Sequence, residues 1–278
     1  MKAAMIRTIA LAILLAVVLA GCAGPSATPT GPSGATPTVS PAPEEIDRDA
    51  TLNLMGVWSP ITATHGNPMI NGFPLSPGLY CWDAMFDTQA FDSETPFIPM
   101  LAESYAVDES NKTVTMTLKP GVLWSDGVPI TVEDVKASLS MQVNRSYVWD
   151  FIESVDIVDD RTIRVRFTNY NLIVLSKVLG VAVNIRYEDY KEHVDRLYEV
   201  IDNHRYLDPE SGRWQIDLDG GKLYVKFNGL LGKVKPDLTE IPVTGPFRFT
   251  SVTNDEIIMV RNENYWNADK VYFKTLVQ

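Results

Sequence analysis

The chain has 278 residues, of which 45% are apolar and 21% charged, with a formal net charge of −11 and two cysteines. These fractions exclude wholesale disorder, and two cysteines are too few for a disulfide scaffold. The length predicts one large domain or two smaller ones, and the acidic balance argues against a nucleic-acid partner, because phosphate binding needs clustered Lys and Arg.

Residues 1–21 have the pattern of a secretory signal peptide. Lys2 and Arg7 form a short positive region, and Ile9–Val18 is an uninterrupted apolar run. A membrane-spanning helix needs about 20 apolar residues, so this run is too short to span a bilayer stably. The following Leu19-Ala20-Gly21-Cys22 resembles the bacterial lipobox, which implies that Cys22 is lipidated and becomes the new N-terminus. A plain membrane anchor with an incidental cysteine is the alternative.

Residues 22–49 form a predicted tether between Cys22 and the folded part. Residues 23–43 are almost entirely Gly, Pro, Ser, Thr and Ala, which lack the apolar side chains and the periodicity needed to pack. Removal of residues 1–21 takes away two basic residues and no acid, so the remaining chain carries a net charge of −13. Cys81 is then unpaired, and we expect it to be buried. The predicted location is the extracytoplasmic face of the cell membrane, with the lipid as the anchor.

Strand patterns dominate the folded region, which is predicted to begin near Ala50. Thr113–Leu118, for example, alternates strictly between threonine and apolar residues, which is typical of a half-buried strand. Short polar turns separate several such segments and indicate hairpins. The predicted strands and hairpins are Thr51–Trp58, Thr113–Leu118, Val155–Val158 with Thr162–Phe167, Trp214–Leu218 with Leu223–Phe227, and Phe247–Val252 with Ile257–Arg261.

Helices are predicted at fewer places. The spacing of apolar residues in Leu79–Thr88 predicts a short helix, and Arg186–Asn203 has helical spacing over a longer stretch. Thr131 followed three residues later by Asp134 is a helix-capping pattern, which predicts a helix through about Asn144. The predicted class is therefore mixed, with more strand than helix.

No catalytic or metal-binding motif stands out. His193 and His204 lie about 16 Å apart on a helix, too far to share one metal ion. The acidic segment Asp217–Gly220 lacks the ligand spacing of a calcium loop and is interpreted as a hairpin turn. Zinc-protease, hydrolase and dinucleotide-binding motifs are missing from the sequence. We therefore predict no enzyme, no metal and no cofactor. An extracytoplasmic hydrolase that uses paired carboxylates remains the rival class, because such a pair cannot be read from sequence.

Two signatures, at residues 101–135 and 244–266, carry a resemblance to a known family. The first is Leu101–Tyr105 followed by Leu118-Lys119-Pro120-Gly121-Val122 and by Trp124-Ser125-Asp126-Gly127, which continues to Val135. The second is Thr244-Gly245-Pro246-Phe247 with Arg261-Asn262-x-Asn264-Tyr265-Trp266. Together they resemble family 5 of the bacterial solute-binding proteins, the dipeptide, oligopeptide and nickel receptors of ABC importers. The motif residues themselves are interpreted as packing and turn elements of the scaffold.

The resemblance implies a fold and a site. The fold would be α/β (mixed α+β), namely the N-terminal lobe of a two-lobed periplasmic-binding-protein-like fold of type II, cluster C. Residues 50–278 would form this lobe, with an inserted subdomain at about 80–180. In the peptide binders of the family the ligand lies extended along strand edges, by strand addition. The implied ligand-binding residues are Gly56, Val57, Trp58, Ser59, Tyr80 and Trp82.

The chain departs from the family pattern near the implied ligand side, so the identity of the ligand stays open. Trp58-Ser59-Pro60-Ile61 and Tyr80-Cys81-Trp82-Asp83 replace the usual residues near the implied ligand side, and residues 189–242 match poorly. Family receptors are about twice as long, so the chain is expected to end at the crossing into a missing second lobe, as a truncated copy. We predict a monomeric peptide-binding lipoprotein that delivers its cargo to ABC permease subunits. An oligosaccharide or a nickel chelate is the alternative cargo.

Overall fold

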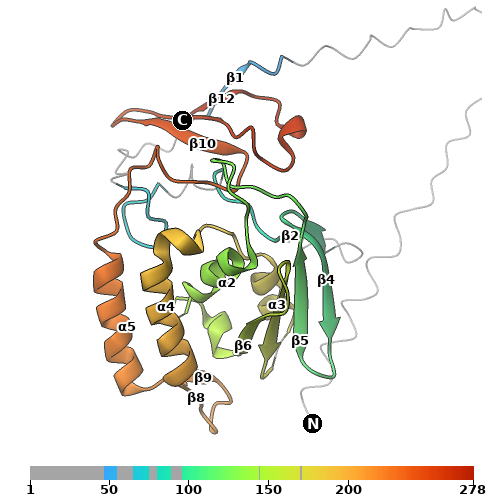
Figure 1. The fold of residues 1–278 in the computed structure, drawn as a ribbon, viewed down its shortest axis with the longest axis vertical. Coiled ribbons are helices and arrows are strands. Elements are labelled where there is room, and N and C mark those ends of the chain that lie inside the picture. Colours follow the sequence, from blue (N-terminus) through green and yellow to red (C-terminus); the bar gives the residue numbers. More distant parts are fainter. Residues whose placement is uncertain (1–46, 55–64, 75–79, 89–95, 144, 170) are drawn as a thin grey trace, which may run out of the picture. The chain divides into compact units, whose positions relative to one another are not determined.

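The computed structural model describes residues 47–54, 65–74, 80–88, 96–143, 145–169 and 171–278 (Figure 1). Residues from 46 onward form one compact unit. Cys22 and the segment Gly56–Ser59, both singled out above, lie outside the described residues. The remaining two candidates, Tyr80 and Trp82, are described.

Strands form two four-stranded sheets and two short pairs. One sheet has the order β1-β12-β11-β10, in which β1 and β12 run parallel and the other neighbours antiparallel. The other sheet, β4-β5-β7-β6, is antiparallel throughout. The short antiparallel pairs are β2-β3 and β8-β9. The strands are β1 (Thr51–Asn53), β2 (Phe86–Thr88), β3 (Phe97–Pro99), β4 (Ala102–Asp108), β5 (Thr113–Leu118), β6 (Ile152–Ile157), β7 (Thr162–Phe167), β8 (Arg205–Leu207), β9 (Trp214–Ile216), β10 (Phe247–Val252), β11 (Ile257–Arg261) and β12 (Thr275–Val277).

Helices cover the sheet that contains β5. Helix α2 packs on β6 and β7, α4 packs on α2, and α5 packs on α4, so the long helices lie side by side in Figure 1. The buried faces follow helical spacing, as with Tyr190, Val194 and Leu197 of α4. The helices are α2 (Val132–Ser140), α3 (Leu172–Leu179), α4 (Tyr187–Asn203) and α5 (Leu218–Leu231), with 3₁₀ turns η1 (Tyr147–Asp150) and η2 (Ala268–Lys270).

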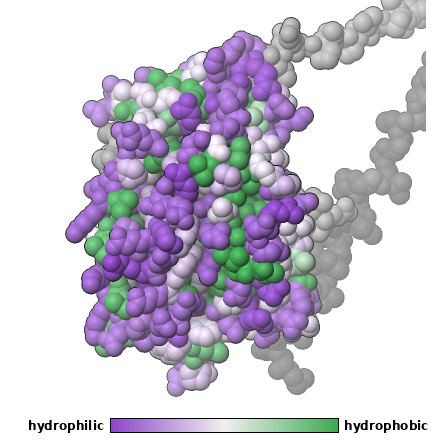
Figure 2. All heavy atoms as spheres, viewed as in Figure 1, coloured by the Kyte–Doolittle hydropathy of each residue, from purple (hydrophilic) through white to green (hydrophobic). Residues whose placement is uncertain are grey.

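Two apolar cores correspond to these layers. The larger one lies between the helices and the β5 sheet and includes the fully buried Trp124. The smaller one lies on the sheet that contains β10 and includes Phe249 and Met259. Trp82 packs against both cores, so it stands at their junction. Figure 2 shows a mostly hydrophilic surface over the described residues, with hydrophobic groups along the edge where α5 lies.

Several sequence predictions are confirmed. The alternation of Thr113–Leu118 gives β5, in which Val114, Met116 and Leu118 are buried. The capping pattern at Thr131 forms a complete capping box at the start of α2, although this helix ends at Ser140 rather than near Asn144. The turn at Ser125–Gly127 is present, with Gly127 at φ 86°. The hairpins β6-β7 and β10-β11 and the helix α4 are also as predicted.

Two predictions of local structure are wrong. The segment predicted as a helix over Leu79–Thr88 instead begins, where described, with a turn and continues into β2, because its backbone pairs with distant segments rather than with itself. Met85 N–H, for example, donates to the Val181 carbonyl at 3.0 Å. The predicted second strand Leu223–Phe227 belongs to helix α5, whose Tyr224, Phe227 and Leu231 form a buried stripe. The segment Asp217–Gly220 is therefore a helix start and not a hairpin turn.

Candidate functional site

Two extended segments meet beside the first turn of α4 and create the candidate site. Ala84 and Ala182 form an antiparallel bridge, and Val183 N–H donates to the Asp83 carbonyl at 2.9 Å. The same register sets Trp82 opposite Asn184. Thr244 fixes this arrangement, since its Oγ1 accepts from Asp83 N–H at 2.9 Å and donates to the Val183 carbonyl at 2.8 Å. A signature residue from far along the sequence thus holds both segments together.

Gly245, the next residue of the second signature, allows this close packing. Its N–H donates to the Cys81 carbonyl at 2.8 Å. A Cβ at this position would lie 2.7 Å from the Cys81 carbonyl carbon and 2.8 Å from Trp82 N, both of which are backbone atoms. Only a residue without a side chain fits there. The Thr-Gly-Pro-Phe signature therefore has a structural role, as predicted for the motif residues.

Trp82 and Asn184 line a pocket of about 240 Å³. Trp124 and Tyr190 contribute further aromatic groups, and Arg186, Asp189 and Glu240 contribute charged ones. The opposite wall comes from the residues that precede β10, including Pro236 and Ile241. The pocket is therefore partly aromatic and partly charged, and it lies where the two cores join. We call it the Trp82–Asn184 pocket.

The pocket contains one buried donor and one buried acceptor without partners. Trp82 Nε1 and the Asn184 side-chain oxygen are both buried, and neither has a hydrogen-bond partner in the described structure. An unpaired buried polar group costs roughly 1–3 kcal/mol of folding free energy. Most such groups in native proteins are paired, and an exception calls for an explanation. Here both residues line one pocket, which makes their free groups a candidate donor and acceptor for a third group.

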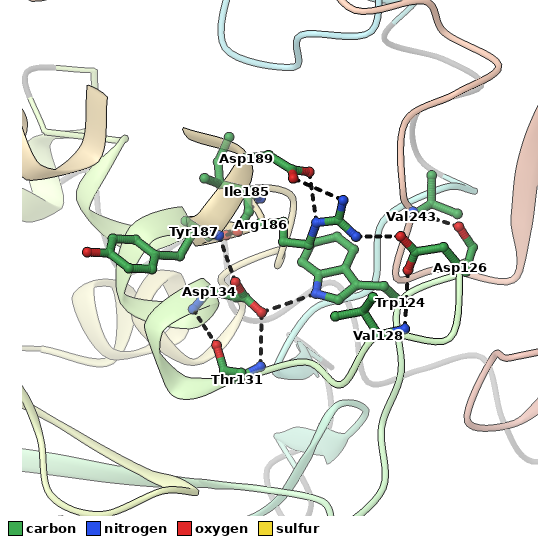
Figure 3. A network of polar contacts seen from close by, with 12 residues as sticks. Trp124, Asp126, Val128, Thr131, Asp134, Ile185, Arg186, Tyr187, Asp189 and Val243 are labelled. Atoms are coloured by element: carbon green, nitrogen blue, oxygen red, sulfur yellow. Dashed lines mark hydrogen bonds and ion pairs between the residues drawn. The ribbon is translucent and has the colours of Figure 1, made fainter. Parts of the chain in front are cut away.

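An arginine clamp forms the charged side of the pocket (Figure 3). Arg186 donates to both carboxylate oxygens of Asp189, at 2.8 and 2.9 Å, and to Asp126 of the first signature at 2.5 Å. Burial lowers the pKa of Arg186, but the hydrogen bonds and charges of Asp189 and Asp126 outweigh it and raise this pKa overall. Three N–H groups of the guanidinium are thus engaged within the protein, and they tie the start of α4 to the Ser125–Gly127 turn.

Asp134 stabilises the contact between the Trp124 segment, the start of α2 and the start of α4. Its carboxylate accepts hydrogen bonds from Trp124 Nε1 at 3.1 Å, Thr131 N–H at 2.9 Å and Tyr187 N–H at 2.7 Å (Figure 3). Burial raises the pKa of Asp134, and these three donors act in the opposite direction. One carboxylate therefore joins the first signature, the N-terminus of α2 and the N-terminus of α4. Trp124 and Asp134 of the first signature therefore have a structural role in this junction.

The candidates from sequence analysis have different outcomes. Trp82 lines the pocket, whereas Tyr80 is 36% exposed and is not among the residues that line it. Asn184 was missed, because it lies in a short extended stretch between α3 and α4 that has no motif. Cys81 is buried as expected, and burial raises the pKa of its thiol well above its ordinary value.

Neither a metal-binding cluster nor a membrane-spanning helix is found in the described residues. They contain no group of three or more His, Cys, Asp or Glu side chains arranged to hold a metal ion. Asp217, part of the acidic segment considered above, caps α5 by accepting from Gly220 N–H at 2.7 Å. Within the same part of the chain, no helix is both long enough and apolar enough to cross a membrane.

Comparison with known proteins identifies the family. Residues 96–278, which include both signatures and every residue of the clamp, match the model of the bacterial extracellular solute-binding proteins, family 5 Middle. The chain belongs to this family. A curated relative, a probable peptide ABC transporter periplasmic-binding protein of Sinorhizobium fredii, is 26% identical over 113 residues, which cover 39% of this chain and 20% of the relative.

Solved structures of family 5 solute-binding proteins show the same fold. A periplasmic oligopeptide-binding protein from Thermotoga maritima, bound to mannohexaose, has a TM-score of 0.53 and 18% identity. The match covers 84% of this chain and 38% of that one. NikA from Brucella suis, in complex with Fe(III)-EDTA, has a TM-score of 0.52 and 16% identity over 82% of this chain and 39% of that one. The chain thus spans less than half the length of these structures, and the fold corresponds to part of a lobed receptor.

Proposed function

We propose that this solute-binding protein captures peptides for an ABC importer and that the Trp82–Asn184 pocket contacts the peptide main chain. The observation that carries the proposal is the pair of buried, unpartnered groups, an indole N–H and an amide oxygen. A peptide unit offers one carbonyl acceptor and one N–H donor, so it is complementary to this pair. Arg186 and Asp189 beside the pair are engaged with each other in the clamp, which favours a neutral amide over an ionic group at this end of the pocket.

Main-chain recognition suits a receptor for varied peptides. Hydrogen bonds to the backbone give affinity without reading side chains, and aromatic walls accept many apolar groups. Trp82 and Trp124 provide such walls. Under this proposal Gly56, Val57, Trp58, Ser59 and Tyr80 remain candidate contacts for neighbouring peptide units, and no residue is assigned a catalytic role.

An oligosaccharide is the second candidate cargo. Tryptophan and tyrosine rings stack on sugar rings as readily as on apolar side chains, and the pocket contains three aromatic residues. The Thermotoga maritima neighbour is described as an oligopeptide-binding protein and yet contains mannohexaose. A sugar hydroxyl can also serve as donor and acceptor to the unpartnered pair. The experiment therefore needs both probes.

The test follows the indole N–H groups by NMR. The chain has six tryptophans, so six indole signals are expected, and the Trp82→Phe variant identifies the Trp82 signal by its loss. Titration with tetra-alanine should shift the Trp82 signal in a saturable way, because a new hydrogen bond changes its chemical environment. In Trp82→Phe, binding of tetra-alanine measured by calorimetry should weaken about tenfold, since a hydrogen bond in a buried site is worth about that factor.

Trp214→Phe is the matched control. Trp214 Nε1 is also buried without a partner, but Trp214 is not among the residues that line the Trp82–Asn184 pocket. In this variant the Trp82 signal should respond to tetra-alanine as it does in the unmodified chain. If the Trp82 signal shifts on addition of mannohexaose but not of tetra-alanine, the cargo is an oligosaccharide and not a peptide. A Trp82 signal that ignores both probes in the folded protein would overturn the proposed site.

The membrane attachment is a separate part of the proposal. We infer that residues 1–21 direct export, that lipidated Cys22 anchors the chain outside the cytoplasmic membrane, and that residues 23–49 act as the tether. Expression in a bacterial host with radiolabelled palmitate should label the protein, and Cys22→Ser should remove the label. Cys81→Ser is the control, because Cys81 is buried and should not affect labelling. Unlabelled protein with intact Cys22 would contradict lipidation.

A further inference from the structure

A second pocket lies between the β8-β9 hairpin and η1. Its volume is about 320 Å³, and its lining includes Trp149, Asp150, Arg205, Trp214 and Gln215. It shares no lining residue with the Trp82–Asn184 pocket. Most of it is built by residues 205–221, within the stretch that departs from the family pattern. We call it the Arg205–Trp214 pocket.

Arg205 is the charged group of this pocket. Its Cζ lies 5.2 Å from the ring centre of Trp149 and 5.1 Å from that of Trp214. Its Nη2 donates to the carbonyls of Trp149, at 2.9 Å, and of Ile152, which fastens β8 to η1. Among the described residues, no carboxylate lies within ion-pair distance of this guanidinium, and its Nε and Nη1 have no hydrogen-bond partner. Arg205 is therefore held rigidly while part of its donor capacity is unused.

The other polar groups of the pocket show the same bias toward donors. Trp214 Nε1 is buried and has no partner in the described structure, whereas Trp149 Nε1 donates to the Leu139 carbonyl at 2.9 Å. The amide of Gln215 is engaged with Asp208 and Tyr206. Asp150 forms an ion pair with Arg213 at 3.7 Å. Apart from the Asp150 carboxylate, which is paired with Arg213, the side-chain groups left without a partner are an indole N–H and guanidinium N–H groups, which are donors.

A set of donors around a positive charge selects a ligand with acceptor oxygens and a negative charge. A carboxylate meets this requirement, because its two oxygens accept several hydrogen bonds and arginine binds it in a fixed geometry. The volume lies at the small end of ligand pockets, which run from about 300 to 1,000 Å³. We propose that the Arg205–Trp214 pocket is a second binding site, which takes a small carboxylate through Arg205 and Trp214 Nε1. The ligand is a free small molecule or the C-terminal carboxylate of a short peptide.

The electrostatics of Arg205 agree with this assignment. Burial lowers the pKa of Arg205 to about 10, and the more distant charges of Asp150 and Asp202 only partly oppose that effect. The guanidinium still carries its charge at neutral pH, so a bound carboxylate would supply the close counter-charge that the described residues do not.

The experiment uses N-acetyl-L-alanine as the probe and its neutral amide as the matched control. Both have the same shape and differ in the charge of one group. We expect the acid to shift the Trp214 indole signal in a saturable way, with the signal assigned by its loss in Trp214→Phe. Trp214→Phe keeps an aromatic ring beside Arg205 and removes only the N–H, so affinity for the acid measured by calorimetry should fall about tenfold. The five remaining indole signals report whether this variant is folded.

Several outcomes would overturn the assignment. An unchanged Trp214 signal in the folded chain at tens of millimolar acid would do so. An equal response to the acid and the amide, or to sodium chloride at the same ionic strength, would show that no carboxylate is recognised. A comparison of trialanine with trialanine amide distinguishes the two sources of the carboxylate. A site for peptide C-termini should bind trialanine and not its amide, whereas a site for free small carboxylates that excludes peptides should bind neither. Trp82→Phe should bind the acid as the unmodified chain does, because the two pockets share no lining residue. A negative result at the Arg205–Trp214 pocket therefore leaves the peptide proposal intact, and a negative result at the Trp82–Asn184 pocket leaves the carboxylate proposal intact.

Discussion

Trp266 donates its indole Nε1–H to the Asp83 carboxylate at 2.7 Å across 183 positions of the sequence. Asp83 is 7% exposed, and its second oxygen accepts from Ala84 N–H at 3.0 Å. Lys119 of the first signature lies over the Trp266 ring, with its Nζ 3.4 Å from the ring centre. The two signatures therefore meet around one buried carboxylate. Burial raises the pKa of Asp83, and the hydrogen bond from Trp266 opposes that increase.

Trp266→Phe should destabilise the fold through this carboxylate. The variant keeps a ring beneath Lys119 but removes the donor, so Asp83 loses one of its hydrogen bonds in a buried place. We expect the free energy of unfolding in urea to fall by about 1–3 kcal/mol. Trp214→Phe makes the same chemical change where the indole N–H has no partner, and it should cost less. Equal losses in the two variants would show that the hydrogen bond contributes nothing.

Gly245→Ala should be one of the more damaging small substitutions. The added methyl would lie 2.7–2.8 Å from backbone atoms of Tyr80, Cys81 and Trp82, which cannot move aside independently. We expect a loss of roughly 1–3 kcal/mol in the free energy of unfolding. Gly229→Ala is the matched control, because a Cβ at Gly229 of α5 meets no atom within 4 Å. That variant should gain about 0.5–1 kcal/mol from helix propensity, and a loss there would contradict the assigned helix.

Thr131→Ala should weaken the start of α2. Thr131 Oγ1 accepts from Asp134 N–H at 3.3 Å, which satisfies one of the free N–H groups at the helix N-terminus. We expect a loss of about 1 kcal/mol, measured by chemical denaturation. Thr131→Ser keeps the hydroxyl and should retain most of the stability. If the serine variant were as unstable as the alanine variant, the methyl group rather than the cap would be responsible.

Asp217→Asn tests the electrostatic part of the α5 cap. The hydrogen bond from Gly220 N–H, helped by His204, lowers the pKa of Asp217 below its usual value. The unfolded chain then binds a proton at a higher pH than the folded one, so the charge stabilises the fold above the ordinary aspartate pKa. This stabilisation is lost as the pH falls through the lowered, folded value.

The measurement is the difference in free energy of unfolding between the unmodified chain and Asp217→Asn, from neutral pH down to the acid range. Asparagine is also a good helix cap, so the difference reports the charge alone. We expect it to favour the unmodified chain at neutral pH and to shrink on acidification. Asp219→Asn, two residues further along in the first turn of α5, is the control. A difference that stays constant with pH would contradict the role of the Asp217 charge.

Local patterns accounted for much of the fold. The alternation that gives β5, the capping box of α2, the Gly127 turn and two hairpins each depend on residues close in sequence, where side-chain spacing and turn chemistry decide the conformation. The helix α5 is the instructive failure. Its Gly220-Gly221 pair is typical of a turn, yet a Cβ at Gly220 would lie 2.4 Å from His204 Cβ. The glycine permits contact between a helix and its neighbour, and spacing alone does not reveal such a contact.

The sequence by itself determined the family, through two signatures whose residues mostly hold the scaffold together. The resemblance also singled out Trp82 as a ligand-binding candidate, within a segment whose predicted helix does not form. Only the tertiary structure decided that Trp82 and Asn184 line one pocket and that both keep an unpaired polar group. The physical reason is that hydrogen-bond satisfaction is a property of packed neighbours. A sequence lists donors and acceptors, but which of them remain without a partner depends on segments that the fold brings together.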